Sequence, residues 1–172
     1  MSGNDPFDDI EGIIGGVGEH PFPDAETMVA KGIEILSQSP MSFPLVEIVE
    51  QEQLKIHVIH AAREASYVPD GKEIYIGVTK YNPTQPARFV LLLADALLDV
   101  SLDKEGFTQP LLTEVKEKYI SKAATRKAKK IAHLCAIAFD LDQKEQFSGY
   151  RFVDAMHEMG HNEAMDVFVG NI

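Results

Sequence analysis

Cysteine, tryptophan and long apolar runs are scarce in this chain. It contains one cysteine and no tryptophan, and no unbroken apolar run is longer than that of residues 89–94. A single cysteine excludes an internal disulfide and is typical of a reducing compartment, and a run this short cannot cross a bilayer. The first residues also lack the positive charge and apolar stretch of a signal peptide. We therefore expect a soluble, cytoplasmic protein with no membrane partner.

Positive charge is scarce as well. The 172 residues include 16 basic and 27 acidic side chains, so the formal net charge is -11. A molecule with this excess of negative charge repels a phosphate backbone, which excludes nucleic acid as a partner. Hydrophobic residues make up 45% of the chain, enough for the continuous core of one domain.

Two parts of the chain differ in composition. Residues 1–23 form an acidic, glycine-rich N-terminal arm, and residues 24–172 form a single domain. The arm cannot pack a core of its own, yet four apolar residues recur in it at helical spacing: Phe7, Ile10, Ile14 and Val17. It is either a flexible tail or an arm that docks on the domain or on a protein partner.

The first half of the domain combines helical and strand patterns. Helices are expected over residues 24–37 and from Ser42 onward, where serine is a suitable N-cap. Alternating apolar residues indicate strands at 54–60 and 72–78, and the turn signal Pro-Asp-Gly lies just before the second of them.

Beyond residue 84 the sequence favours helices almost to its end. The segment 84–100 is apolar nearly all round, which is typical of a central buried helix. Two further helices are expected over 108–140 and 143–167. We therefore predict an α+β fold, a mostly helical single domain with a small two- or three-stranded sheet.

The last of these predicted helices contains HEMGH, which matches the H-E-x-x-H pattern of zinc peptidases. In a continuous helix His157 and His161 lie one turn apart on one face, at the spacing that lets two imidazoles bind one zinc ion. Glu158, about 100° away around the helix, is then the general base. The motif thus indicates His157 and His161 as metal ligands and Glu158 as the catalytic residue.

A catalytic zinc also needs a third protein ligand. It would have to come from upstream, where His57, His60 and Glu114 are candidates. Two other interpretations stay open. The motif's histidines are a structural pair that is packed or hydrogen-bonded beneath the C-terminal segment, or they are a pH-responsive pair whose protonation the neighbouring carboxylates favour.

The residues HEMGHN resemble the beginning of the adamalysin-type metzincin motif. In that family the motif continues with a glycine and a third zinc-binding histidine, and these positions are Ala164 and Val167 here. This resemblance therefore implies two ligands and a base without the residues that complete the zinc site.

A second pattern covers most of the chain. Ala65, Tyr67 and Pro69 fit an A-x-Y-x-P segment, and Ile74 and Ile76 follow in a strand. This order of elements resembles a bacterial family of zincin-like metallopeptidases, in which the next helix carries H-E-L-x-H.

The corresponding helix reads LLLADALLDV here. The resemblance implies that Ala94 and Leu98 replace the two histidines and that Asp95 lies near the position of the glutamate. It implies a zincin-like scaffold that has lost its metal site, which is typical of a protein whose function is binding and not catalysis.

Two other features have simpler interpretations. Seven of the sixteen basic residues fall between Lys116 and Lys130. This basic strip is either a solvated helix face or a docking site for an acidic partner, of which the protein's own arm is one. Cys135 lies among apolar residues, which indicates a small buried core residue.

Two functions follow. The favoured one is a non-catalytic protein-interaction module, a pseudoenzyme on a degenerate zincin-like scaffold, which needs no cofactor and holds a protein partner through the arm or the basic strip. The alternative is a small zinc-dependent metallopeptidase that uses HEMGH.

Overall fold

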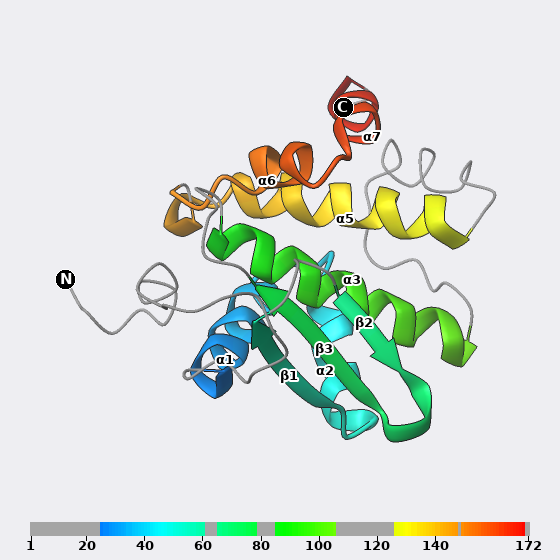
Figure 1. The fold of residues 1–172 in the computed structure, drawn as a ribbon. Coiled ribbons are helices and arrows are strands. Elements are labelled where there is room, and N and C mark those ends of the chain that lie inside the picture. Colours follow the sequence, from blue (N-terminus) through cyan, green and yellow to red (C-terminus); the bar gives the residue numbers. More distant parts are fainter. Residues whose placement is uncertain (1–24, 61–64, 79–84, 106–125, 148, 171–172) are drawn as a thin grey trace.

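Figure 1 shows the computed structural model, which describes residues 25–60, 65–78, 85–105, 126–147 and 149–170. The elements in chain order are α1 (Ala25–Leu36), α2 (Phe43–Gln51), β1 (Lys55–His60), β2 (Ala65–Val68), the 3-10 turn η2 (Pro69–Gly71), β3 (Glu73–Val78), α3 (Gln85–Glu105), α5 (Arg126–Asp142), the 3-10 turn η3 (Glu145–Phe147), α6 (Phe152–Glu158) and α7 (Asn162–Gly170). The expected α+β class, mostly helical with a small sheet, is confirmed. Among the helices of these ranges, none is long and apolar enough to cross a membrane.

The sheet has three strands in the order β1-β3-β2. β1 runs parallel to β3, and β2 runs antiparallel to it, with Ala65 opposite Ile76 and Tyr67 opposite Ile74. The predicted alternation of apolar side chains along the strands is confirmed, because Ile74 and Ile76 of β3 and Val58 of β1 are buried in the core. β2 is the third strand of the sheet, for which two or three strands were predicted.

Helix α3 is the centre of the core, as its sequence predicts. It lies between the sheet and the pair α5 and α6 (Figure 1). Every side chain over 87–100 is buried except those of Asp95 and Asp99, which keep part of their surface exposed. α1 approaches α3 so closely that a Cβ at Gly32 would lie 3.1 Å from Leu93 and 3.2 Å from Phe89.

The turn after α1 is tied to its neighbours by serine hydroxyls. Ser42 occupies the predicted N-cap position of α2, but its Oγ donates to the carbonyl of Leu36 at 2.5 Å and accepts no capping hydrogen bond from an amide of α2. Ser39 Oγ donates to Oδ2 of Asp140 on α5 at 2.5 Å. The turn therefore fixes α5 against the N-terminal helices.

Only the second part of the helix predicted over 108–140 can be compared with the structure. Residues 106–125 lie outside the described ranges, and α5 covers the rest and continues to Asp142. Cys135 on α5 is fully buried, which confirms its prediction as a core residue. Burial raises the pKa of its thiol to about 12, so it is not a reactive thiolate.

The single helix predicted over 143–167 is wrong. The chain instead forms η3, α6 and α7 in this region. Asp142 accepts hydrogen bonds from the backbone amides of Phe152 at 2.8 Å and Val153 at 2.9 Å, and so supplies the missing partners at the start of α6. Gly160, with a φ of 91°, separates α6 from α7 in the middle of HEMGH.

Candidate functional site

HEMGH forms the end of a helix. The amide of Gly160 donates to the carbonyl of His157 at 3.0 Å, and the amide of His161 donates to the carbonyl of Met156 at 3.0 Å. This is the Schellman pattern of a helix C-terminus, in which glycine supplies the left-handed residue. The prediction that His157 and His161 lie on one face of a continuous helix is therefore wrong.

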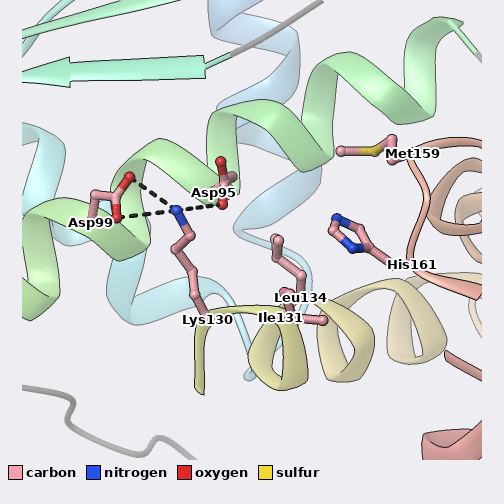
Figure 2. Close-up of a pocket in the computed structure, with 7 residues that line it drawn as sticks. All are labelled: Asp95, Asp99, Lys130, Ile131, Leu134, Met159 and His161. Atoms are coloured by element: carbon pink, nitrogen blue, oxygen red, sulfur yellow. Dashed lines mark hydrogen bonds and ion pairs between the residues drawn. The ribbon is translucent and has the colours of Figure 1, made fainter. Parts of the chain in front are cut away.

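The three predicted site residues have separate surroundings. His157 Nε2 lies 3.2 Å from Oδ1 of Asp166 on α7, and Glu158 Oε1 lies 3.4 Å from Nη1 of Arg88 on α3. His161 projects from the α6–α7 turn toward the space between α3 and α5 (Figure 2). Within the described ranges, no group of three or more His, Cys, Asp or Glu side chains is placed to hold a metal ion. The zinc site of HEMGH stays a prediction.

The candidate third ligands are not brought to HEMGH in the part of the chain that the structure describes. His57 lies on β1, where its Nε2 is 3.2 Å from Oε2 of Glu73 and its ring stacks on Tyr75 with 4.7 Å between centroids. β1 is on the opposite side of α3 from α6 (Figure 1). Glu114 and the side chain of His60 lie outside the described part.

The space that His161 faces is a cavity of about 500 Å³, which we call the α3–α5 cavity. Its lining combines apolar and ionisable side chains: Asp95, Asp99, Lys130, Ile131, Leu134, Met159 and His161. A volume of this size and a mixed lining are typical of ligand-binding pockets. The α3–α5 cavity is therefore a candidate ligand-binding site.

A lysine ammonium lies between two carboxylates in this cavity. Lys130 reaches from α5 to α3, where its Nζ is 3.1 Å from Oδ1 of Asp95 and 3.1 Å from both carboxylate oxygens of Asp99 (Figure 2). Asp95 and Asp99 lie one helical turn apart on α3, so both reach the same cation. We call these three side chains the charged cluster. They are 20–24% exposed, so water screens their attraction only in part.

The charged cluster shifts two pKa values. Burial is the main cause that raises the pKa of Asp95, and the nearby Lys130 ammonium offsets only part of this effect. For Lys130, burial alone would lower the pKa, but its attraction to Asp95 and its hydrogen bonds to both carboxylates outweigh burial and raise the pKa above 10.5. Lys130 is therefore a cation at neutral pH.

The charged cluster is not predicted from the sequence. The basic strip predicted there includes Lys130, whereas the Lys130 ammonium is bound within the protein by Asp95 and Asp99. The sequence does contain a signal for the cluster. Two aspartates four residues apart on an otherwise apolar helix are partly buried together, and they need a cation nearby. Residues 116–125 of the strip and the side chains of 126–129 lie outside the described part, as does the N-terminal arm.

The cavity also bears on the central helix of the zincin-like resemblance. Ala94 and Leu98, which stand at the histidine positions in that comparison, are buried in the core. The side chains of α3 that reach the cavity are those of the next residues, Asp95 and Asp99.

In comparisons with known proteins, the chain matches no family model, no curated protein and no solved structure.

Proposed function

We propose that the chain is a non-catalytic protein-interaction module of the cytoplasm, a pseudoenzyme on a zincin-like scaffold. The observation that carries this proposal is the position of Lys130 Nζ between Asp95 and Asp99. The carboxylate pair lies on the helix that carries the metal ligands in the zincin-like family, and an internal cation occupies it. An ammonium nitrogen has no open coordination position for a water oxygen, so it cannot activate a water molecule as zinc does.

The order of the elements supports the zincin-like part of the proposal. Two helices precede the first strand, and a long apolar helix follows β3. Between the strands, Ala65 and Tyr67 lie on β2 and Pro69 begins η2, in agreement with the A-x-Y-x-P segment of the resemblance.

The geometry of HEMGH supports the non-catalytic part. Glu158 pairs with Arg88, whose side chain is only 10% exposed, and His157 pairs with Asp166. A zinc peptidase that used this motif would have to break both pairs and rebuild the turn at Gly160 as helix. We therefore place the zinc metallopeptidase second.

The N-terminal arm is the proposed contact with the protein partner. Its four apolar residues are the ones that the sequence singles out: Phe7, Ile10, Ile14 and Val17. The basic strip is the second candidate, without Lys130, because Asp95 and Asp99 already bind that ammonium. The excess of acidic residues supports a partner that is not a nucleic acid.

Metal analysis tests the choice between the two functions. The purified full-length protein is equilibrated with zinc, desalted and analysed for zinc content and for casein hydrolysis. We expect less than stoichiometric zinc and no hydrolysis, both unchanged in His157→Ala and in the matched control Asp154→Ala on the same helix. One zinc per chain with hydrolysis, both lost in His157→Ala alone, would establish the peptidase.

The partner contact has its own test. All four apolar residues of the arm are replaced by serine in the full-length chain, and crosslinked partners from the native host are compared with those of the wild type. We expect the substitutions to remove the main crosslinked protein. An unchanged set of partners would exclude the arm as the contact.

A further inference from the structure

We infer that the α3–α5 cavity binds a neutral, mainly apolar small molecule, about the size of an aromatic ring with a short chain. This binding function goes beyond the proposed contact with a protein partner, and the two can fail separately. It is carried by the combination of a cavity of about 500 Å³, a wall that continues the hydrophobic core, and an ammonium ion whose hydrogen bonds are made within the protein.

The Lys130 ammonium makes its hydrogen bonds to the two aspartates of the charged cluster. Its Nζ lies 3.1 Å from Oδ1 of Asp95 and 3.1 Å from each carboxylate oxygen of Asp99. An ammonium ion has three hydrogens, and these oxygens can accept all of them. An anionic ligand therefore finds no spare hydrogen on Lys130, and a cationic ligand would have to compete with Lys130 for the carboxylates. A charge brought into this partly buried space is costly, which favours a neutral ligand.

Hydrophobic side chains form the rest of the cavity wall. Ile131 and Leu134 lie three residues apart on α5 and share one face of that helix, and Met159 follows the end of α6. Leu134 belongs to the core, and Ile131 and Met159 pack against it. Figure 2 shows the charged cluster at one end of the drawn side chains and Met159 with His161 at the other. Water beside the hydrophobic part lacks the polar partners that hold buried water, so an apolar ligand gains free energy by replacing it.

The arrangement of the lining is that of a small-molecule pocket. The lining side chains come from α3, from α5 and from the turn between α6 and α7, so a ligand has protein around it on several sides. The volume of about 500 Å³ is within the usual range of ligand pockets, whose walls are mostly apolar with a few polar groups. The flexible thioether of Met159 lets the wall adapt to the shape of the ligand.

Three molecules with the same ring and different charge test the inference on the full-length protein. Phenylethanol, phenethylamine and phenylacetate are titrated at neutral pH while the methyl signals of Ile131, Leu134 and Met159 are followed by NMR. We expect the neutral alcohol to shift all three signals and to bind at least about fivefold more tightly than either charged molecule. A charged molecule that binds as tightly as the alcohol, or the absence of a shift with the alcohol, would overturn the inference.

Variants assign the binding to the cavity. Ile131→Phe, which places a larger side chain in the cavity, should weaken phenylethanol binding at least about tenfold, and Met159→Ala, which removes part of the wall, about threefold. The matched control is Val46→Ala on α2, because Val46 also packs against the core but lies outside the cavity lining. Circular dichroism checks that each variant is folded. Unchanged affinity in Met159→Ala and in a folded Ile131→Phe would overturn the assignment to this cavity.

Two further measurements separate the sources and the functions. Acetyl-Ala-Phe-Ala-amide carries the same ring on a peptide, and we expect it to bind more weakly than phenylethanol. Tighter binding of the peptide would show that the cavity takes a protein side chain and would overturn the assignment to a small molecule. Crosslinking of partners with and without saturating phenylethanol should give the same proteins. Loss of the main crosslinked protein would identify the cavity as the partner contact and would contradict a separate binding function.

Discussion

HEMGH and the charged cluster use the same spacing of four residues with opposite results. His157 and His161 lie on either side of the left-handed Gly160, where α6 ends, and their side chains have different surroundings. Asp95 and Asp99 lie within the unbroken α3 and reach one ammonium ion. A spacing of four therefore brings two side chains together only where the helix continues between them.

The two regions also differ in exposure. The side chains of the His157–Asp166 pair are 35% and 75% exposed, whereas those of the charged cluster are 20–24% exposed. Exposed ion pairs contribute little to stability, but a partly buried charge that loses its partner is costly. We therefore expect the charged cluster to contribute more to stability than the His157–Asp166 pair.

The largest effect is expected for Lys130→Ala. The substitution leaves Asp95 and Asp99 close together without their ammonium, and we expect the free energy of unfolding to fall by about 3 kcal/mol. Urea unfolding followed by circular dichroism measures the loss. The triple variant with Asp95→Asn and Asp99→Asn added should recover more than half of it. A triple variant as unstable as Lys130→Ala would show that packing of the lysine stem, and not charge, explains the loss.

A loss of stability of comparable size is expected when acid protonates His133. Burial on α5 lowers the pKa of His133 to about 4, and the hydrogen bond with the carbonyl of Met41 at 2.8 Å opposes this only in part. The unfolded chain takes up this proton near the ordinary value of 6.5. Stability is therefore complete above pH 6.5 and is lost as the pH falls toward 4, by roughly 3 kcal/mol.

Urea unfolding at pH 7, 5.5 and 4.5 measures this dependence. The variant His133→Gln should lose less stability between pH 7 and 4.5 than the wild type. His157→Gln is the matched control, because it replaces a histidine whose side chain is 35% exposed. Equal slopes for His133→Gln and the wild type would assign the acid sensitivity to other groups.

A smaller effect is expected for Gly160→Ala. No atom lies within 4 Å of the added Cβ, so the cost comes from the left-handed backbone alone and should be about 1 kcal/mol. The matched control is Gly149→Ala, where the space is equally open and φ is not positive. Thermal unfolding should show a lower Tm for Gly160→Ala only. Equal Tm values would mean that α6 does not need to end at Gly160.

The smallest effect is expected for His157→Ala. Its partner Asp166 is 75% exposed, so the loss should not exceed about 0.5 kcal/mol. Urea unfolding of the variant and of Asp166→Ala gives the comparison, and the two values should agree. A loss above 2 kcal/mol in His157→Ala would indicate a structural role that the pair with Asp166 does not explain.

Much of the fold could be predicted from local patterns. The buried strand β3, the central helix α3 and the core position of Cys135 are confirmed, because periodicity and apolar runs act over a few residues. The end of α6 is also predictable from a local pattern, since glycine is the usual residue just after a helix and Gly160 lies there. The interpretation of HEMGH as a metal motif conflicts with this glycine signal, because the motif requires a continuous helix.

By itself, the sequence determined the α+β class, the apolar centre and the net charge of -11. Only the tertiary structure decided which charges meet. Lys130 is 31 residues from Asp99 along the chain, and the packing of α5 on α3 brings them to 3.1 Å. Residues that are distant in sequence meet only when buried surfaces associate, and no local period records which surfaces those are.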